Sequence, residues 1–339
     1  MQQPFIGAEA IAKGALTRHT LRTRFTAIHD GVYLAVGTEL TPRLRAQAAW
    51  LRSRRSGVLA GFSAAALYGA RWIDACHPAH IIDDNRRRES GIVVWGDAID
   101  EDEIRMVAGM RVTSPMRTAI DLARKFPPAV SIPMIDALAR KTKLTRAQLL
   151  AALPRYAGRQ GIVRARMAFA LVDPGAQSPP ETRLRLLFLS AGYPWPQSQC
   201  PVPDEFGCVI GNTDGGWRRK KIGYEYEGEH HLTVEQLRYD IWRYEAMREA
   251  GWNILRFTSR DGDATILARM AKAWDAAERH SAACDGGAGI RAKTALSSLA
   301  AQCRVLGADG DGTRVTVGRK SAQKSPNRHT QGGERRPRS

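Results

Sequence analysis

The chain has 339 residues, of which 43% are hydrophobic, enough for a packed core and too many for a wholly disordered protein. Its 51 Lys and Arg outnumber its 34 Asp and Glu, and the net charge of +17 favours binding to polyanions such as DNA. No run of about 18 apolar residues occurs and the start lacks a signal peptide, so neither a membrane-spanning helix nor secretion is expected. The five cysteines form no CxxC motif, which is typical of a cytoplasmic protein in a reducing compartment.

Residues 1–60 are predicted to form a winged-helix-like DNA-binding module. The segments GAEAIAKG and LTRHTLRTRF predict two short helices, and Thr17 is suited to cap the second. The next segment, FTAIHDGVYLAVG, alternates enough for a hairpin or wing. A recognition helix would present basic side chains to DNA, and the candidates on or beside the second helix are Arg18, Arg22 and Arg24. A basic helical cap that only packs on the rest of the chain is the alternative.

Residues 61–172 are predicted to be mostly helical, with strands only within 92–112. In TSPMRTAIDLARK, Ser114 is suited to cap a helix whose first turn contains Pro115. Further helices are expected at about 129–141, 145–153 and 159–171. The turn-rich segment DPGAQSPPE then separates this region from the next one.

Residues 178–280 are predicted to form a second domain with the element order α-β-β-β-α-β-α. ETRLRLLFLSAG predicts a helix, and QSQCPVP, GCVIGNTD and KIGYEYEG predict three short strands. A helix from Val234 to Ala250, begun by a capping box of Thr233 and Gln236, precedes the strand WNILRFTS. A meander followed by a helical crossover makes a mixed sheet flanked by helices, so the fold class is α/β (α+β).

The last segment, residues 281–339, differs in composition from the rest of the chain. It is rich in Gly, Ser, Ala and Arg, and it is predominantly basic. Such a segment cannot bury enough apolar surface to offset chain entropy, so it is predicted to be a disordered basic tail.

The acidic run in NTDGGWRRKKIGYEYEGEHHL is the main candidate for catalytic chemistry. Glu225 and Glu227 are two residues apart on a predicted strand, so they share one face. A turn centred on Arg219 and Lys220 places Asp214 opposite Glu225, with side-chain bases about 5 Å apart, where like charges are destabilising. Mg²⁺ or Mn²⁺ between the carboxylates would relieve that repulsion. An exposed edge strand with solvated acids is the alternative.

Polar residues on neighbouring elements extend this acidic site. Glu181 begins the first helix, where a capping box with Ser178 is a second role for it. Asp240 and Arg243 lie three residues apart on one side of the later helix. The motifs ET-LRLL--AGYP-P--Q, -D-GW, EY-G--H and YD--R-E-----GW-ILR resemble the DUF559 family, in the very-short-patch-repair (Vsr)-like branch of the PD-(D/E)xK restriction-endonuclease fold.

This resemblance implies hydrolysis of DNA by an endonuclease that depends on Mg²⁺ or Mn²⁺. Asp214 matches the central metal-binding aspartate, Glu225 the first acid of the strand motif, and Glu227 a position where the family usually has Asp. Glu181 matches the helix acid that orients a metal-bound water, and His231 matches a histidine that acts as general acid or base. No lysine occupies position 227, and a glycine follows Asp214 where an apolar side chain is expected.

Upstream, LTRHTLR, DGVYLAVG, AGFSAAALYGA and VTSPMRTAIDLAR resemble the N-terminal region of AbiEi-type antitoxins, which implies a winged-helix module. Two functions therefore compete, both with DNA as the partner in the bacterial cytoplasm. One is a metal-dependent endonuclease, and the other is a non-catalytic regulator of the AbiEi antitoxin type with a silent nuclease fold. RNA processing or RNA binding is a third hypothesis. An intact cluster of Asp214, Glu225 and Glu227 favours the enzyme.

Overall fold

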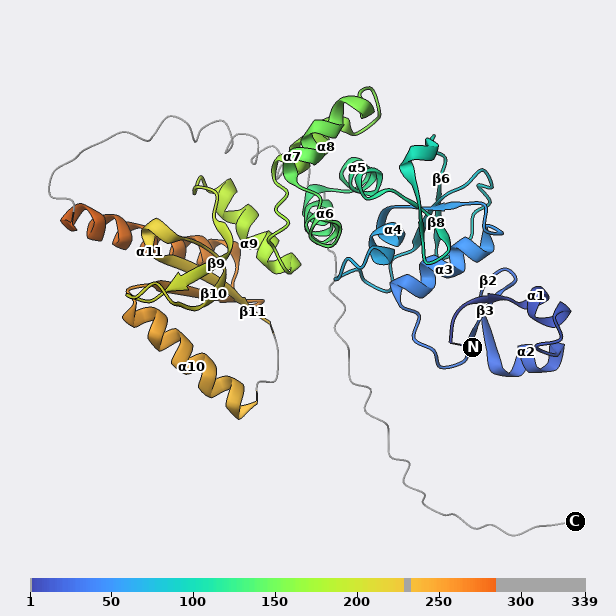
Figure 1. Ribbon diagram of the computed structural model, residues 1–339, viewed down its shortest axis with the longest axis horizontal. Coiled ribbons are helices and arrows are strands. Elements are labelled where there is room, and N and C mark those ends of the chain that lie inside the picture. The colour runs from blue at the N-terminus through green and yellow to red at the C-terminus, as the bar shows by residue number, and fades with distance from the viewer. Residues whose placement is uncertain (1, 229–232, 285–339) are drawn as a thin grey trace, which may run out of the picture.

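The fold is α/β, and the described residues form eleven α-helices and three β-sheets (Figure 1). The computed structural model describes residues 2–228 and 233–284. The predicted site residue His231 and most of the predicted tail, 281–339, lie outside the described residues. No helix in the described ranges is long and apolar enough to cross a membrane. Each sheet belongs to one part of the chain: the N-terminal module (2–52), the middle domain (57–172) and the C-terminal domain (178–228 and 233–284).

The N-terminal module is a three-stranded antiparallel sheet, of order β1-β3-β2, with three helices. Its elements are β1 (Phe5–Ile6), α1 (Gly7–Ala12), α2 (Arg18–Arg24), β2 (Phe25–His29), β3 (Val32–Ala35) and α3 (Pro42–Arg52). Thr17 caps α2 as predicted, because its hydroxyl accepts a hydrogen bond from Thr20 N at 3.1 Å. α3 packs Ala48 and Leu51 into the core of this module and Ala49 into that of the middle domain, so it joins the two cores.

One carboxylate also connects the predicted wing, the β2–β3 hairpin, to the middle domain. Glu89 Oε1 accepts a hydrogen bond from the backbone N–H of Asp30, in the hairpin turn, at 2.8 Å. Glu89 Oε2 is paired with Arg52 Nε of α3 at 2.5 Å. The hairpin therefore has a defined place beside the loop that precedes β6.

The middle domain contains a five-stranded sheet, of order β6-β5-β4-β8-β7, followed by helices. Its elements are β4 (Val58–Leu59), α4 (Gly61–Leu67), β5 (Ala79–Ile82), β6 (Ile92–Trp95), β7 (Ile104–Val107), β8 (Met110–Thr113), α5 (Pro115–Lys125), α6 (Pro128–Thr142), α7 (Arg146–Ala152) and α8 (Ile162–Ala170). Helices do predominate in 61–172, but the expectation of strands only within 92–112 omitted β4 and β5. Both strands are buried on both faces, so they lack the polar alternation that marks a strand in sequence.

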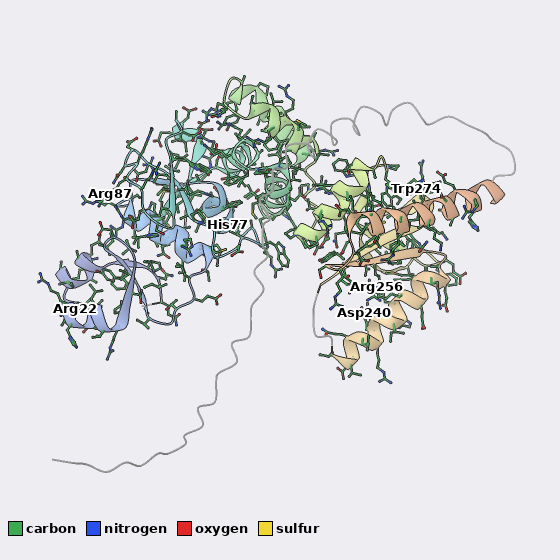
Figure 2. All side chains as sticks on the ribbon, turned by 180° about the vertical axis from the view of Figure 1, so that it is seen from behind. Arg22, His77, Arg87, Asp240, Arg256 and Trp274 are labelled. Atoms are coloured by element: carbon green, nitrogen blue, oxygen red, sulfur yellow. The ribbon has the colours of Figure 1, made fainter. Side chains whose placement is uncertain are left out.

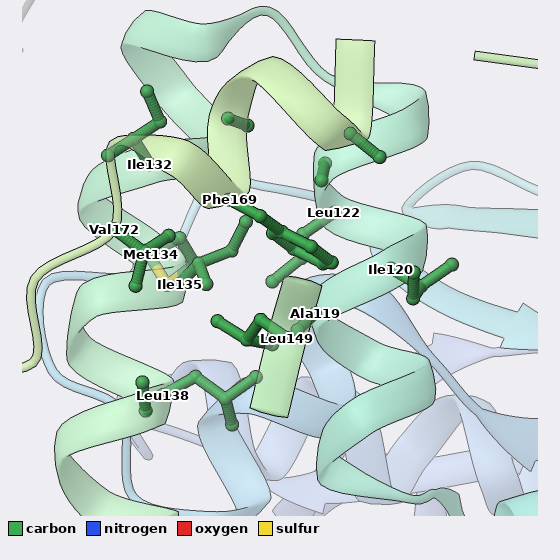
Figure 3. Close-up of a cluster of buried hydrophobic side chains, with 14 of the residues drawn as sticks. Ala119, Ile120, Leu122, Ile132, Met134, Ile135, Leu138, Leu149, Phe169 and Val172 are labelled. Carbon is green, nitrogen blue, oxygen red and sulfur yellow. The ribbon is translucent and has the colours of Figure 1, made fainter. Parts of the chain in front are cut away.

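The helices of the middle domain enclose its main hydrophobic core (Figure 3). α5 begins as predicted, with Ser114 accepting a hydrogen bond from Arg117 N and Pro115 at the first position. Leu122 of α5 and Phe169 of α8 meet in this core with no exposed surface. Burial of such side chains contributes about 1.5–3 kcal/mol each to folding.

The C-terminal domain has the predicted order and the predicted mixed sheet. Its elements are α9 (Pro179–Ser190), β9 (Gln197–Pro203), β10 (Val209–Trp217), β11 (Ile222–Glu227), α10 (Val234–Glu249), β12 (Asn253–Thr258) and α11 (Asp263–Cys284). β9, β10 and β11 form an antiparallel meander, and β12 pairs in parallel with β11 after the α10 crossover. α9 and α11 pack on one face of the sheet through Phe188 and Met270, and α10 covers the other face through Met247.

A buried ion pair joins the C-terminal domain to the middle domain. Arg185 Nη2 of α9 lies 2.6 Å from Asp136 Oδ2 of α6, and both side chains are at most 2% exposed. The same carboxylate accepts hydrogen bonds from Thr182 Oγ1 at 2.9 Å and from Asp173 N at 2.8 Å. The buried carboxylate of Asp136 therefore fixes α9 against the middle domain through Arg185 and Thr182.

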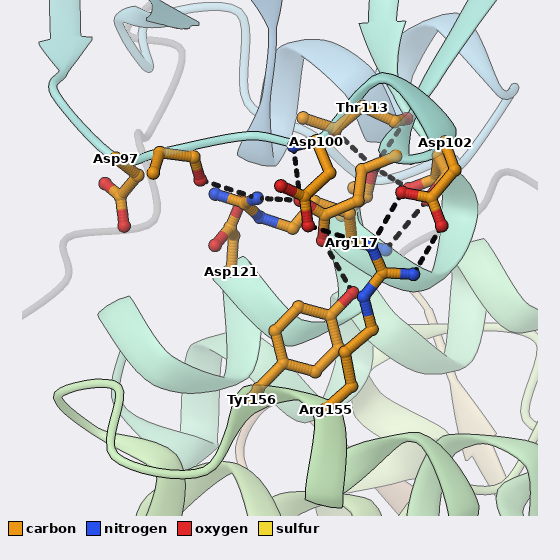
Figure 4. Close-up of polar contacts among 12 residues, drawn as sticks. Asp97, Asp100, Asp102, Thr113, Arg117, Asp121, Arg155 and Tyr156 are labelled. Carbon is orange, nitrogen blue, oxygen red and sulfur yellow. Dashed lines mark hydrogen bonds and ion pairs between the residues drawn. The ribbon is translucent and has the colours of Figure 1, made fainter.

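A second buried polar network lies within the middle domain (Figure 4). Arg117, which has no exposed surface, is 2.9 Å from Asp121 and 2.5 Å from Glu103. The Tyr156 hydroxyl donates to the other oxygen of Glu103 at 2.8 Å. Arg155, on the surface of the same region, pairs with Asp102 at 2.5 Å. Because Arg117 compensates two buried carboxylates, it holds α5 to the segment before β7.

Replacement of Arg117 by methionine should destabilise the protein strongly. The substitution keeps the side-chain volume but leaves Glu103 without its cation and Asp121 with Arg124 alone, at 3.2 Å, and removal of one partner of a buried pair costs about 3–5 kcal/mol. The free energy of unfolding from urea titration checks this value. Arg155→Met is the control, because it removes an ion pair that is open to water, and it should leave the unfolding midpoint unchanged. Equal losses of unfolding free energy in the two variants would contradict a special role for the buried network.

Candidate functional site

α2 presents the three predicted DNA-binding arginines to solvent. Leu21 is the buried residue of this helix and anchors it, while Arg18, Arg22 and Arg24 are all exposed. Within the part of the chain that the structure describes, none of the three forms an ion pair with an acid. Figure 2 shows Arg22 on the outside of the module. The helix therefore offers uncompensated positive charge beside the β2–β3 hairpin.

The strand pairing places Asp214 where the sequence predicted it. β10 and β11 pair with Gly215 opposite Tyr224, and the same register continued by one residue sets Asp214 opposite Glu225. The connection is a short 3₁₀ turn, Arg218–Lys220, as expected. Asp214 Oδ2 accepts a hydrogen bond from the backbone N–H of Tyr226 at 2.7 Å. Its carboxylate thus lies at the end of β11, on the face that also carries Glu225 and Glu227.

Packing explains why two positions of β10 are glycine, which the sequence did not reveal. A β-carbon at Gly215 would collide with the ring and hydroxyl of Tyr224, its cross-strand partner. Tyr224, almost fully buried, therefore fills the space where an apolar side chain was expected after Asp214. At Gly211 a β-carbon would meet Met247 and Arg243, so this glycine lets α10 approach the sheet.

The acids of β11 are paired with arginine side chains. Glu225 accepts two hydrogen bonds from Arg243, at 2.8 and 3.1 Å, and a further one from the Tyr244 hydroxyl. Glu227 Oε1 lies 2.7 Å from Arg256 Nε and 3.0 Å from the Tyr244 hydroxyl. Two guanidinium groups and one phenol thus bind both oxygens of Glu225 and Oε1 of Glu227, a role for Tyr244 that sequence analysis missed.

The predicted supporting pair forms part of this network. Asp240 Oδ1 lies 3.6 Å from Arg243 Nε on the same helix. Asp240 and Arg256 lie near each other in the C-terminal domain in Figure 2. Arg243 therefore bridges Asp240 and Glu225 and ties α10 to β11.

Glu181 reaches the same region from the start of α9. One of its oxygens accepts from the Ser178 hydroxyl at 2.9 Å, which confirms their predicted local contact. The other accepts from Gln177 N at 2.8 Å and from Gln199 Nε2 at 3.2 Å. Gln199 of β9 has a left-handed backbone, with φ of +48°, and the β9–β10 register sets it opposite Asp214. In the sequence, the contact of Gln199 with Glu181 is indicated only by the Gln that ends the motif ET-LRLL--AGYP-P--Q.

Asp214, like Glu181, has no cationic partner in the described residues, and the pKa of Asp214 is strongly shifted. Burial, then the charges of Glu181, Glu225 and Glu227, raise the pKa of Asp214 to about 7, against the opposing Tyr226 hydrogen bond. Burial also raises the pKa of Glu181. For Glu227, burial is outweighed by Arg256, and the pKa is lowered. Asp214 therefore gains or loses its proton near neutral pH.

The acids as they lie do not fit a metal ion. Carboxylate oxygens suit Mg²⁺, but those of Glu225 and Glu227 are already bound by Arg243, Arg256 and Tyr244. Among residues 2–228 and 233–284, no three or more His, Cys, Asp or Glu side chains are grouped to hold a metal. The sequence placed Asp214, Glu225 and Glu227 together, with Arg243 as a supporting residue. It did not indicate that arginines bind both glutamates.

Comparison with known families concerns the middle domain, the part that carries Arg117 and the five-stranded sheet. Residues 57–170 match the AbiEi antitoxin C-terminal domain family. The match begins at β4 and ends with α8, so this AbiEi-type domain coincides with the middle domain. The expected AbiEi resemblance lay in the N-terminal region, and only AGFSAAALYGA and VTSPMRTAIDLAR of its motifs lie within the matched range.

The chain is also similar to a mycobacterial relative over most of its length. The chain is 28% identical over 251 residues to the uncharacterised proteins MT2308 and Rv2248 of Mycobacterium tuberculosis strains CDC 1551 / Oshkosh and ATCC 25618 / H37Rv. The alignment covers 73% of this chain and 91% of the relative. No solved structure matches the chain significantly.

The raised pKa of Asp214 predicts an unusual pH dependence of stability. A carboxyl whose pKa is higher in the folded state stabilises the fold when protonated, and this stability is lost as pH rises from about 4 to about 7. Asp214→Asn keeps an acceptor for Tyr226 N and cannot ionise. The variant should therefore be more stable than the wild type at pH 8, by about 2–4 kcal/mol, with the difference vanishing towards pH 4. Chemical denaturation across this range measures the difference.

Glu227→Gln is the control of opposite sign. The lowered pKa of Glu227 means that its ionised form stabilises the fold above its ordinary pKa of 4.5. Glu227→Gln should therefore lower stability at pH 8 and have little effect at low pH. A stabilised Glu227→Gln, or an Asp214→Asn variant that parallels the wild type at every pH, would show that the acids interact differently.

Proposed function

We propose that the protein is a DNA-binding regulator of the antitoxin type. The match of residues 57–170 to an antitoxin domain family supports this class of function. The net charge of +17 suits a nucleic-acid partner. Upstream of the matched domain, the N-terminal module has an exposed basic helix, α2, followed by the β2–β3 hairpin, which supports the predicted winged-helix role. DNA is proposed as the ligand of that module.

The observation that carries this proposal is the set of exposed arginines on α2. Arg18 and Arg22 are four residues apart, so they lie on one side of the helix, and both are exposed, whereas Leu21 is the buried residue of α2. Arg24 extends the charge to the start of the hairpin. Arginine forms bidentate contacts with phosphate and with guanine, and these side chains carry no competing acid in the described residues.

The pairing of the acids in the C-terminal domain supports a regulator more than an enzyme. Arg243 and Arg256 give Glu225 and Glu227 a structural role, because they close the α10 crossover onto β11. A silent nuclease fold would retain this order of elements without exposing its acids to a metal. Under this proposal the C-terminal domain has a structural or binding role.

We keep one second candidate, a DNA endonuclease that depends on Mg²⁺ or Mn²⁺, because of Asp214. This carboxyl is half-buried among other acids and has a pKa of about 7, and such perturbed groups are concentrated at functional sites. The α-β-β-β-α-β order and the DUF559-like motifs also support it. Glu181 and His231 are its proposed additional catalytic residues, with Asp214 and Glu225 as the proposed metal ligands.

DNA binding by α2 should be strongly dependent on salt. If Arg18, Arg22 and Arg24 each neutralise one phosphate, their replacement by alanine should reduce the slope of log K against log salt by about 3. Fluorescence anisotropy with a labelled duplex of about 30 base pairs measures this slope. The salt concentration is varied from about 50 to about 200 mM, the range in which phosphate contacts change the affinity strongly. Competition with an RNA duplex separates DNA from RNA as the ligand.

The matched control replaces three exposed basic residues of the middle domain, Arg140, Lys141 and Lys143, by alanine. It removes the same charge from the protein but leaves α2 intact, so the slope should change much less. Equal weakening by both triple variants would mean that net charge alone, and not α2, governs binding. Absence of binding at low salt would refute the DNA-binding proposal.

The two candidate functions are separated by a metal titration and a cleavage assay. For a nuclease, Mg²⁺ or Mn²⁺ should raise the melting temperature by binding linkage, and supercoiled plasmid should be cut with Mg²⁺ but not with EDTA. Asp214→Asn should abolish both effects, with Asp240→Asn as a control outside the proposed metal ligands. If neither metal changes the melting temperature and the plasmid stays intact, the regulator is the candidate that remains.

A further inference from the structure

We propose that Arg243 and Arg256 serve as internal cations that keep divalent metal ions out of the C-terminal domain. The site concerned, here called the acidic site, consists of Asp214, Glu225 and Glu227. A metal-dependent nuclease would use such carboxylates to bind Mg²⁺, whereas here guanidinium groups bind two of the three. The inference rests on the proposed regulatory function, in which this domain needs no metal, but it makes no use of DNA binding by α2.

The two arginines reach the glutamates from the elements on either side of the crossover. Arg243 of α10 donates to both oxygens of Glu225, at 2.8 and 3.1 Å. Arg256 of β12, the strand that pairs with β11, donates through Nε to Glu227 at 2.7 Å. A bidentate contact between arginine and a carboxylate is strong and fixes the orientation of both groups. Each glutamate therefore already has a positive charge at hydrogen-bond distance.

Tyr244 joins the two ion pairs into one unit. Its hydroxyl donates to Glu225 and lies 3.0 Å from Oε1 of Glu227. The guanidinium carbons of Arg243 and Arg256 each lie 4.5 Å from the centroid of its ring. A guanidinium that contacts an aromatic ring and pairs with a carboxylate is restrained by both partners. Tyr244 thus helps to hold both arginines on the acids.

β10, the strand that carries Asp214, leaves room for Arg243. A β-carbon at Gly211 would come within 3.0 Å of Met247 and within 3.3 Å of Cδ of Arg243, so a larger residue would push the arginine stem aside. Nη1 of Arg243 also lies 3.5 Å from the carbonyl oxygen of Asn212. The side chain of Arg243 is 15% exposed, which is low for an arginine at the surface of a helix. The fold therefore provides a defined place for this guanidinium.

The arrangement leaves the acidic site with too few free oxygens for a metal. Mg²⁺ and Mn²⁺ prefer six oxygen ligands in octahedral geometry. Both oxygens of Glu225 are bound by Arg243, and Oδ2 of Asp214 accepts the N–H of Tyr226. In the part of the chain that the structure describes, no three His, Cys, Asp or Glu side chains are grouped to hold a metal. The guanidinium charges would also repel a divalent ion, which could enter only by displacing Arg243 from Glu225.

Loss of both arginines should open the acidic site to a metal. The β10–β11 register sets Asp214 opposite Glu225, and Glu227 shares the face of Glu225, so the freed carboxylates can converge on an ion. The double variant Arg243→Met/Arg256→Met keeps the aliphatic stems and removes both charges. In the full chain it should bind Mn²⁺ at least about tenfold more tightly than the wild type does.

Isothermal titration calorimetry and the electron paramagnetic resonance signal of free Mn²⁺ measure this affinity, and neither depends on catalysis. Adding Asp214→Asn to the double variant should remove the gained binding. A wild type that binds Mn²⁺ as tightly as the double variant would overturn the proposal. A folded double variant that gains no binding would overturn it as well, and so would a gain that survives Asp214→Asn.

The matched control is Arg238→Met/Arg248→Met. Both arginines belong to α10 and are exposed, and neither forms an ion pair in the described ranges. The control removes the same charge from the protein but leaves the acidic site closed, so its affinity for Mn²⁺ should remain that of the wild type. An equal gain in the control would mean that net charge, and not the two internal cations, governs metal binding.

Thermal unfolding separates internal cations from arginines that only support the fold. The melting temperature of the double variant should fall, because two ion pairs are lost, and Mn²⁺ should restore it by binding linkage. Arg256→Met alone is the milder variant, since Arg256 is 48% exposed, and it should gain part of the affinity. A double variant that Mn²⁺ does not stabilise, together with an Arg256→Met variant that binds no better than the wild type, would refute the proposal.

Binding of the labelled duplex by the same variants is measured in parallel, because it reports on α2 and not on the acidic site. Intact duplex binding without any gain of Mn²⁺ affinity would refute the internal cations and leave the proposed function standing. A gain of Mn²⁺ affinity in a chain that binds no duplex would do the reverse.

Discussion

The buried ion pair between Arg185 and Asp136 determines where the C-terminal domain stands relative to the AbiEi-type domain. Both groups leave water, and such a pair rarely stabilises a protein more than apolar side chains would. Its geometric effect is larger, because Arg185 also donates to the carbonyl of Leu171 at 2.5 Å and Thr182 donates to Asp136. These contacts fix the first half of α9, which carries Glu181. The position of one acid of the candidate site is therefore set by a helix of another domain.

Charge compensation explains why the acids of the C-terminal domain differ in character although they lie close together. Glu225 and Glu227 have arginine partners that come from α10 and β12, on either side of the crossover. Asp214 has a backbone N–H as its partner and neighbouring carboxylates as its surroundings. The regulator and nuclease hypotheses thus differ in a single respect, which is whether Arg243 remains on Glu225 when the protein acts.

The sequence predicted what depends on local chemistry and missed what depends on distant contacts. Thr17, Ser114 and Thr233 mark helix starts because the cap hydroxyl and the backbone N–H that donates to it are three residues apart. The meander register followed from one turn, so the place of Asp214 was predictable. The pairing of Arg256 with Glu227 joins strands that a whole helix separates, and no spacing rule foretells it. The α10 helix was predicted, but which of its side chains are buried depends on how Arg243 and Tyr244 turn to the sheet.

The central strand of the middle domain has a consequence for how the chain acquires its structure. β4 is two residues long, and its parallel partner β8 lies more than fifty residues later in the sequence, with Leu59 opposite Val112. A ribosome must therefore release residues beyond β8 before the sheet can close, and loop-closure entropy is spent before this contact forms. Until then β4 presents an open edge. Folding of this domain should be slow compared with its helices, and its nascent form is the stage at which the chain is most exposed to aggregation and to chaperones.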